Sequence, residues 1–459
     1  MQRERGQWGS TVGFVLAAAG SAIGLGNIWR FPYVTGQSGG AAFVVIYLLC
    51  IALICLPYLF AELCLGRHTS RNPVGAIRKV GGRPPWPLVG GLGVLTGVFI
   101  LSYYGVIAGW AFGYIFKVII APNLPHAEFT ASPMVAMPLF AIFIVLTVLV
   151  VVGGVEKGIE RWAKILMPVL LVLMLLVILR GVTLPGAGAG LEFYLKPDFS
   201  KVDGQVVLAA LGQAFYSLSL GMGAMVTYGS YLPKDANLRI SGGAVALADT
   251  GIAILAGFMI FPALFALGKD PAAGPTLIFV VLPELFAEMP LGGLFAVGFF
   301  VLLSIAALTS TVSLLEVVVS YFVDEQRWSR KKSVWVVGAI AFVIGLPSAL
   351  SQGAVDFLDN VPLFGRLFGT SNFLYAMDFI WGNLSLAIGA LLLSIFVGWV
   401  WGYERAGEEL KRGSGLTDTG VRVWGFFLRF VCPVMIFIVL LDLVLTHTFG
   451  LSLFALIGF

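Results

Sequence analysis

The first long apolar segment of this chain contains Gly20-Ser21-Ala22-Ile23-Gly24-Leu25-Gly26-Asn27-Ile28-Trp29-Arg30-Phe31-Pro32. Its apolar surroundings predict an uninterrupted helix, but three glycines fall within seven residues, and an amide and an arginine follow. In hydrocarbon, every backbone N–H and C=O group needs a partner, so unwound backbone is tolerated only where it lines a cavity enclosed by protein. The stretch therefore predicts a site that holds small ions or polar groups with the backbone itself.

The composition predicts an all-α polytopic membrane protein. Hydrophobic residues make up 59% of the 459 residues and charged residues 11%, whereas an average soluble domain has about a quarter charged residues. Runs of ~20 apolar residues, each long enough for a helix across the bilayer, recur throughout, and the alternating segments of a β-barrel are missing. The cysteines and histidines show no disulfide or metal-ligand spacing, so we expect no cofactor.

We expect eleven membrane spans. They cover residues 10–36, 39–65, 87–118, 134–153, 159–181, 205–231, 240–267, 292–323, 334–350, 373–400 and 422–446. Twenty of the 28 lysines and arginines lie in the connections on one side of these spans and six on the other. By the positive-inside rule the N-terminus is cytoplasmic, so eleven crossings leave the C-terminus outside. The net charge of +4 follows from this asymmetry and does not indicate nucleic-acid binding.

The sixth span carries a second break, Gly212-Gln213-Ala214-Phe215-Tyr216-Ser217-Leu218-Ser219-Leu220-Gly221-Met222-Gly223-Ala224. Its Gly-x-Gly repeats the pattern of the first span five spans later, and an odd number of crossings makes the two copies run in opposite directions. This layout is typical of an inverted repeat with discontinuous helices, which indicates a secondary transporter's binding site. Glycine used only for close helix packing is the alternative.

Span eight adds a cluster of hydroxyl groups at Ser304, Thr309, Ser310, Thr311 and Ser313. Single hydroxyls in membrane helices usually bond to the carbonyl four residues back. A cluster of this density beside two broken helices instead indicates oxygen ligands for a hard cation such as sodium.

Three of these motifs resemble the neurotransmitter:sodium symporter family: Gly20 to Pro32, Gln213 to Gly223, and Ala306 to Ser310. The resemblance covers spans one to ten in order and spacing, span eleven fits it, and eleven-span members occur mainly among prokaryotes. It implies a LeuT-like fold of two inverted five-helix repeats plus an eleventh span, with spans 1 and 6 discontinuous. We therefore expect a multi-pass protein in the cytoplasmic (inner) membrane of a prokaryote, as a monomer or weak homodimer.

The implied organisation has six parts. They are a cytoplasmic segment at 1–9, the first five-helix repeat at 10–181, an extracellular loop at 182–204, the second repeat at 205–400, a cytoplasmic loop at 401–421, and the eleventh span with a short extracellular C-terminus at 422–459. The outer loops 182–204 and 268–291 are punctuated by Pro and Gly and partly apolar. We interpret them either as lids packed over the bundle or as plain surface loops.

The resemblance implies two sodium sites built from carbonyl, amide, carboxylate and hydroxyl oxygens. The first uses Ala22, Asn27, Ser217 and Asp249 with the substrate carboxylate, and the second uses Gly20, Ile23, Ala306, Thr309 and Ser310. Chloride-dependent relatives place a chloride ion beside the first site, whereas chloride-independent ones carry a fixed carboxylate. Asp249 stands where many members have an amide, and Ala253 removes a polar chloride ligand, so we expect chloride-independent transport. A structural aspartate bonded within the bundle is the alternative.

The implied substrate pocket lies between spans one, three, six and eight. Its residues are Ser21, Ala22, Gly24, Leu25, Gly26, Ile100, Tyr104, Tyr216, Ser217, Ser219, Met222, Ser310 and Leu314. Backbone N–H groups around Leu25, the Tyr104 hydroxyl and a sodium ion would hold a carboxylate, and carbonyls with Ser219 an ammonium group. Monoamine-carrying relatives have a carboxylate at the position of Gly24, so its absence favours an α-amino acid.

The side-chain part of the pocket would be apolar. Ile100, Leu314, the adaptable thioether of Met222 and the ring of Tyr216 suit medium to large hydrophobic or aromatic side chains. Tyr216 stands where the family pattern leads us to expect phenylalanine, so its hydroxyl either needs a partner or narrows the pocket.

Two gates follow from the resemblance. Arg30 and Asp378 would form the extracellular gate, and Arg5, Trp8, Ser230, Tyr231 and Asp324 the intracellular one. Glu316 is a further buried carboxylate, which we expect to brace the unwound part of span one by accepting backbone N–H bonds, with proton coupling as the alternative.

These features predict a sodium-coupled symporter that imports an L-α-amino acid, hydrophobic or aromatic, by alternating access with two sodium ions. A symporter of a small amino acid or of a GABA- or betaine-like osmolyte is the alternative, and a channel or an intramembrane enzyme a remote one. An enzyme would need paired catalytic groups at membrane depth, but Asp249, Glu316 and Glu62 lie in separate motifs with no histidine near them.

Overall fold

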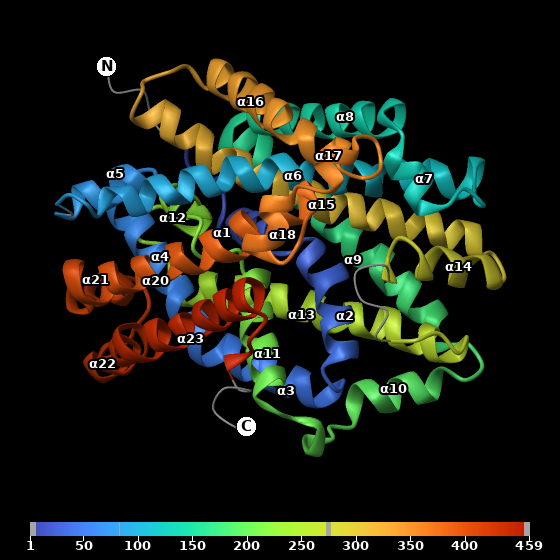
Figure 1. Ribbon diagram of the computed structural model, residues 1–459. Helices are drawn as coiled ribbons and strands as arrows, with labels where there is room; N and C mark the ends of the chain where they lie inside the picture. Colours follow the sequence, from blue (N-terminus) through green and yellow to red (C-terminus); the bar gives the residue numbers. More distant parts are fainter. Residues whose placement is uncertain (1–5, 82, 272–276, 454–459) are drawn as a thin grey trace.

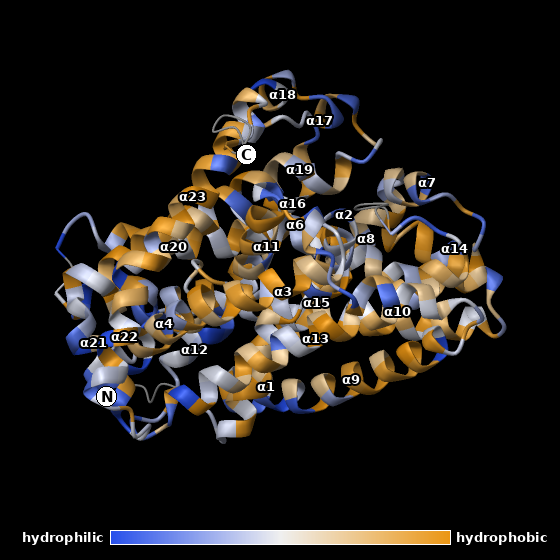
Figure 2. Cartoon of the chain, turned by 90° about the horizontal axis from the view of Figure 1, so that it is seen from below, coloured by the Kyte–Doolittle hydropathy of each residue, from blue (hydrophilic) through white to orange (hydrophobic). Residues whose placement is uncertain are grey.

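A computed structural model describes residues 6–81, 83–271 and 277–453 of the chain. Within these ranges the protein is helical and contains no strand, which confirms the all-α class. Most helices run roughly along one direction (Figure 1). Apolar residues dominate their long middle parts, and hydrophilic residues gather at one end around α21 (Tyr403–Lys411), α22 (Asp418–Phe426) and the N-terminus (Figure 2).

The helices of the expected spans occur in the expected order. The bounds are α1 (Thr11–Ala22), η1 (Gly26–Arg30) and α2 (Phe31–Gln37); α3 (Ala41–Cys50), η2 (Ile51–Cys55) and α4 (Leu56–Thr69); α6 (Pro87–Ile120); α8 (Pro133–Val152); η3 (Val155–Glu160) and α9 (Arg161–Val182); α11 (Gly204–Ser217) and α12 (Ala224–Gly229); α13 (Leu238–Ala266); α15 (Gly292–Asp324); α16 (Arg330–Leu350); α19 (Phe373–Met377), η6 (Asp378–Ser385), α20 (Leu386–Ile395) and η7 (Phe396–Gly402); and α22, η8 (Phe427–Val431), α23 (Cys432–Val444) and η9 (Leu445–Phe449).

Among the described residues, nine helices are long and apolar enough to cross a membrane, and the first span joins them as a tenth if its two halves are counted together. Those halves meet at an angle of 55°. The sixth span is split into α11 and α12, each too short to cross alone. Both discontinuous spans therefore lie where the glycine patterns predict them.

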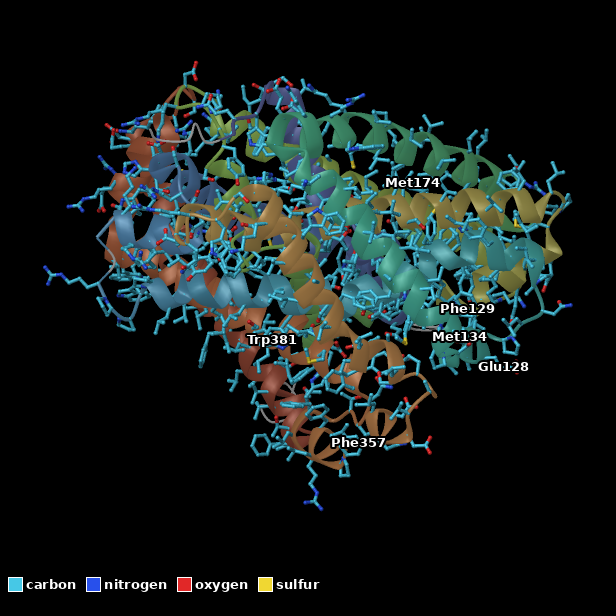
Figure 3. The ribbon with its side chains drawn as sticks, turned by 90° about the horizontal axis from the view of Figure 1, so that it is seen from above. Glu128, Phe129, Met134, Met174, Phe357 and Trp381 are labelled. Carbon is cyan, nitrogen blue, oxygen red and sulfur yellow. The ribbon has the colours of Figure 1, made fainter. Side chains whose placement is uncertain are left out.

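Short helices cover the two ends of the bundle. They are α5 (Pro73–Lys79), α7 (His126–Ala131), α10 (Ala187–Leu195), η4 (Phe199–Lys201), α14 (Val281–Glu288), α17 (Asp356–Asp359) and α18 (Pro362–Phe368). The two long outer loops pack against the bundle through α10, which contacts α13, and α14, which contacts α15. The part that holds α17, marked by Phe357, projects beyond the bundle (Figure 3).

The centre of the bundle is the pair α6 and α15, which also contacts α8, α9 and α16. Small residues allow this close approach: a Cβ atom at Gly109 would lie 2.9 Å from the backbone of Phe140, and one at Gly97 would lie 3.4 Å from the Leu314 carbonyl. Membrane helices use such small residues because packing, rather than exclusion of water, holds them together. This tight pair forms the wall against which the broken spans lie.

Candidate functional site

The break in the first span leaves backbone groups free to face other helices. Ile23 takes an extended conformation and ends α1, and its N–H donates to the Ala19 carbonyl at 2.7 Å. The next two N–H groups have side-chain partners: Gly24 donates to Asn27 Oδ1 at 3.1 Å, and Leu25 donates to the Tyr104 hydroxyl at 3.0 Å. A Cβ atom at Gly24 would lie 2.5 Å from Ser310 Oγ and 2.8 Å from the Tyr104 hydroxyl, so any larger residue would displace these two side chains.

The break in the sixth span is held by a carboxylate from span two. Gly221 has φ +89° and approaches the Leu386 carbonyl so closely that a Cβ atom would not fit. Its N–H donates to Oε1 of Glu62 at 2.9 Å, and Glu62 is fully buried. This role of Glu62 was not predicted, although an intramembrane carboxylate is by itself a signal of function.

The two breaks also contact each other. Gln213 donates from Nε2 to the Gly26 carbonyl at 2.9 Å, and Ser219 donates to the Ser21 carbonyl at 3.2 Å. Ser219 has φ +52°, a left-handed conformation uncommon outside glycine, which marks a constrained position.

A cavity opens between these breaks and the α6–α15 wall. It is lined by Ser21, Ala22, Gly24, Gly26, Ile100, Tyr103, Tyr104, Tyr216, Ser219, Met222, Ser310, Leu314 and Leu386. All the residues predicted for the substrate pocket line it except Leu25 and Ser217, which lie directly beside it. Tyr103 and Leu386 also line the cavity but were not predicted. Tyr103 is adjacent to Tyr104, and two successive residues of a helix rarely face the same cavity. Leu386 lies in α20, outside the four spans that were expected to form the pocket.

The residues predicted for the first sodium site form one buried cluster. Asn27 Nδ2 donates to Asp249 Oδ1 at 2.7 Å and to Ser217 Oγ at 3.0 Å, and Ser217 Oγ donates to Asp249 Oδ2 at 2.8 Å. The Tyr47 hydroxyl adds a bond to Ser217 Oγ at 3.3 Å. Asn27, Ser217 and Asp249 have no exposed surface. An ionised Asp249 would place a negative charge beside the break in span one.

The second predicted sodium site is brought together as well. Ser310 Oγ lies 3.3 Å from the Ile23 carbonyl, and Thr309 Oγ1 lies 3.0 Å from the Ala306 carbonyl. Gly20 faces Thr309, since a Cβ atom there would lie 3.1 Å from the Thr309 Cβ. Carbonyl and hydroxyl oxygens thus gather from the end of α1 and the middle of α15, which is the ligand chemistry that suits a hard cation.

The predicted extracellular gate lies above the cavity. The Arg30 guanidinium sits 4.5 Å from the centre of the Tyr216 ring, and Asp378 faces it within electrostatic range. Among the described residues no ion pair shorter than 4.0 Å joins Arg30 and Asp378, so the ring of Tyr216 is the direct contact. Nearby, Trp381 of η6 (labelled in Figure 3) stacks on Phe99 of α6 at 4.1 Å, which fixes η6 against the wall.

The predicted intracellular gate is partly described. Trp8 is buried, its Nε1 donates to the Tyr228 carbonyl at 2.9 Å, and its backbone N–H donates to the Tyr231 carbonyl at 3.3 Å. Asp324 accepts bonds from the backbone and side chain of Asn72 at 2.9 and 3.2 Å. Ser230 follows α12 directly. Arg5 lies outside the described residues.

The prediction that Glu316 braces span one is wrong. Glu316 accepts from the Tyr231 hydroxyl at 2.6 Å and from Arg330 Nη1 at 3.1 Å, and Arg330 Nε also donates to the Val151 carbonyl at 3.0 Å. Glu316 lies six residues beyond Ser310, about 9 Å farther along the axis of α15, so it does not reach the break in span one. The residue joins span six to spans eight and nine and extends the intracellular gate.

Comparisons with known proteins agree with this geometry. The family model described as "Sodium:neurotransmitter symporter family" matches residues 5–133 and 123–451. The "uncharacterized sodium-dependent transporter YhdH" of Bacillus subtilis is 41% identical over 95% of this chain and 97% of its own. The human "sodium- and chloride-dependent GABA transporter 2" is 27% identical over 89% of this chain and 75% of its own. The crystal structure of MhsT in complex with L-phenylalanine is 45% identical and superposes with a TM-score of 0.85, covering 95% of this chain and 99% of MhsT.

The fold and the site thus define a LeuT-fold, sodium-coupled membrane transporter of amino acids. The chain belongs to the sodium:neurotransmitter symporter family. This is a family of transporters, so the alternative of an intramembrane enzyme is set aside.

Proposed function

We propose that this protein imports a hydrophobic or aromatic L-α-amino acid together with two sodium ions and without chloride. The observation that carries the proposal is the cavity, which is lined both by the span-one break at Ser21 to Gly26 and by the apolar side chains Ile100, Met222 and Leu314. MhsT, whose crystal structure holds L-phenylalanine, supports an aromatic cargo.

Substrate binding would use groups that are paired with each other in the structure. The Tyr104 hydroxyl and the Leu25 N–H, 3.0 Å apart, would both turn to the carboxylate of the substrate, and the first sodium ion would face the same carboxylate. The Ser21 hydroxyl, which is buried and has no partner among the described residues, adds a polar group near the amino end. The apolar wall would then receive the side chain, because burial of apolar area favours larger side chains.

The two clusters around Asp249 and Thr309 would each hold one sodium ion. In the structure, Asn27 Nδ2 occupies the place where Asp249 and Ser217 converge. On sodium binding at the first site, the Asn27 amide would flip so that its oxygen points to that place. The Asp249 carboxylate would supply the charge that chloride supplies in other members. Alternating access would rock one set of helices against the other around this site.

Orientation and organisation complete the proposal. The N-terminus, α5, α21 and α22 would face the cytoplasm, and α7, α10 and α14 would face the outside, in the inner membrane of a prokaryote. The lysine and arginine asymmetry supports this orientation. The chain would be divided into two inverted repeats at 10–181 and 205–400.

Binding of radiolabelled amino acids by the purified protein, with and without sodium, tests the proposal. We expect sodium-dependent binding that phenylalanine, leucine, methionine or tryptophan displaces in preference to glycine, GABA or betaine. Tyr104→Phe should weaken that binding by at least about tenfold, while Tyr321→Phe, in α15 but outside the cavity lining, serves as the control. Indifference to all large apolar amino acids, or displacement by GABA or betaine alone, would contradict the proposed cargo.

A further inference from the structure

A buried ion pair at the hydrophilic end of the bundle joins span two to the helix after span ten. Arg67, at the end of α4, and Glu409, in α21, are 0% and 1% exposed. Arg67 Nε contacts Glu409 Oε1 at 2.7 Å, and its Nη2 donates to the Glu409 backbone carbonyl. Arg412 Nη1 and His68 Nδ1 reach the other carboxylate oxygen at 3.1 and 3.3 Å. Figures 1 and 2 both show α4 and α21 at this end.

The same pair also holds the connection between spans six and seven. Arg67 Nη1 donates to the Ala236 carbonyl, and Lys234 Nζ donates to the carbonyls of Arg67 and His68. Asn237 and Arg239, at the start of α13, donate to the carbonyls of Gly413 and Ser414 at 2.6 and 3.1 Å. Three separate segments of chain therefore meet at one junction, which we call the pin: Arg67 and His68, Lys234 to Arg239, and Glu409 to Ser414.

The connection 230–237 is thus held at both of its ends, but by different kinds of contact. Its first residues belong to the intracellular gate, where Tyr231 reaches Glu316 at 2.6 Å and its carbonyl accepts from Trp8. Its last residues belong to the pin. The gate contacts of Tyr231 reach Trp8 and Glu316 of span eight. The pin instead combines charge-assisted bonds from several side chains to the Glu409 carboxylate and to backbone carbonyls.

We propose that the pin is the cytoplasmic pivot of the transport cycle: it stays closed while the gate beside it opens and shuts. Arg67 and Glu409 would act as positioning residues, which keep the end of span six at a constant distance from span ten as α12 swings. The inference rests on the proposed alternating access.

Breaking the pin would cost more than breaking the gate contacts beside it. Separating a buried arginine from a buried carboxylate leaves two charges without partners in a poorly solvated place, whereas the bonds that Trp8 donates at the gate join neutral groups. A conformational change takes the path that breaks the weaker contacts, and a hinge consists of a few loop or element-end residues that absorb the change in dihedral angles. Residues 232 and 233, between gate and pin, are the connection that would absorb it.

A cross-link tests the pivot directly. In Arg239→Cys/Ser414→Cys, a short bifunctional thiol reagent would tie the junction across the pin and leave Arg67 and Glu409 intact. In the comparison variant Ser10→Cys/Glu160→Cys, the reagent would tie span one to span five, where Ser10 Oγ and Glu160 Oε1 lie 2.8 Å apart. The four native cysteines are buried, so they stay out of reach. The readout is sodium-dependent uptake of radiolabelled phenylalanine or leucine into proteoliposomes, before and after cross-linking.

We expect the pin cross-link to retain at least half of the uptake of the same variant before treatment, and the span-one cross-link to lower uptake at least tenfold. Loss of uptake with the pin cross-linked overturns the pivot. Absence of sodium-dependent amino-acid uptake in the untreated variants and the unmodified protein would instead count against the proposed function.

A single substitution gives a second measurement. Glu409→Gln keeps the shape of the side chain but removes its charge, so we expect uptake to fall at least fivefold while sodium-dependent substrate binding in detergent changes less than twofold. Equal losses of binding and uptake would show a merely structural role and overturn the proposal. Glu192→Gln, which removes a carboxylate from an exposed pair with Lys196, is the matched control.

Discussion

Asp249 is the buried carboxylate at the centre of the proposed first sodium site. It is fully buried, accepts bonds from Asn27 and Ser217, and has no lysine or arginine among its hydrogen-bond partners in the described chain. A buried carboxylate without a cationic side chain is costly unless it meets a cation of another kind. We expect sodium, the ion of this family, to be that cation.

Asp249→Asn should therefore lower sodium-dependent uptake at least tenfold in chloride-free buffer, which corresponds to about 1.4 kcal/mol of lost binding. Chloride should restore part of the uptake in the variant and have no effect on the unmodified protein. Uptake measured against sodium concentration, with and without chloride, checks this. Thr250→Val, the next residue on the helix, is the control; a chloride requirement in the unmodified protein would refute the expectation.

At the scale of elements, the broken spans need partners that an intact helix would not. The sixth span, unlike the first, depends on another span's carboxylate, since Glu62 of α4 accepts the Gly221 N–H. Its second oxygen has no hydrogen-bond partner among the described residues. A single accepting oxygen on the side chain of residue 62 is therefore enough to pair with the Gly221 N–H group.

We expect Glu62→Ala to destabilise the protein by about 1–3 kcal/mol, because the buried Gly221 N–H would lose its acceptor. Glu62→Gln should retain most of the stability and substrate binding, since the amide keeps an accepting oxygen. Thermal unfolding in detergent, followed with and without sodium, checks both. If the two variants lost stability equally, the charge of Glu62 rather than its hydrogen bond would be what matters.

The loop 268–291 is tied to α6 and α7 by an aromatic cluster around Phe279. The Tyr114 hydroxyl donates to the Phe279 carbonyl at 2.9 Å and lies 2.8 Å from His126 Nδ1, and the rings of His126 and Phe279 stack at 5.2 Å. Burial, and secondarily the nearby positive charge of Lys117, lowers the pKa of His126 to about 4. The folded protein therefore holds this imidazole neutral.

This shift predicts a pH dependence of stability. Between pH 6.5, the ordinary pKa of histidine, and about 4, the unfolded chain binds a proton at His126 that the folded chain does not. The contribution of the neutral His126 to stability is therefore fully present above pH 6.5 and decreases as the pH falls through this window. His126→Gln should flatten the dependence of the melting temperature on pH in this window, and His447→Gln should not. An unchanged slope in His126→Gln would contradict this origin.

At the scale of the whole molecule, the gates lie at opposite ends of the cavity and are built differently. The outer one is a cation stacked on an aromatic ring, Arg30 over Tyr216. At the inner one, Trp8 donates a hydrogen bond to the carbonyl of Tyr228 near the end of α12, and Arg330 donates to the Glu316 carboxylate. In the described part of the chain the two gates therefore differ in kind, since one rests on a cation–π contact and the other on hydrogen bonds and an ion pair.

Removing the charge behind the inner gate should shift the protein toward inward-open states. In Arg330→Met, Glu316 loses its cationic partner, and we expect a cysteine at Ala17, which lines a small cavity beside α9, to react at least threefold faster with a thiol reagent. Lys332→Met removes a neighbouring charge that rests on the Trp328 ring and is the control. Equal reactivity in both variants would count against a gating role for Arg330.

The family resemblance predicted most of the cavity lining. From the sequence alone we could predict the membrane class, the order of the spans and both breaks. These follow from local properties: the length of an apolar run, the failure of glycine-rich backbone to hold a helix, and hydroxyls on one stretch of helix. The family resemblance then related Asn27, Ser217 and Asp249 to one another across three helices. The structure found them within hydrogen-bond distance.

Which group each buried charged residue contacts became evident only from the three-dimensional packing of the helices. Glu62 lies 159 residues from Gly221, Glu316 lies 85 from Tyr231, and Arg67 lies 342 from Glu409. A carboxylate in an apolar segment indicates that a partner is present, but which groups face the carboxylate depends on how the helices pack and rotate. For that reason the expected brace of span one by Glu316 failed, and the junction at Arg67 could be seen only when α4 and α21 were placed side by side.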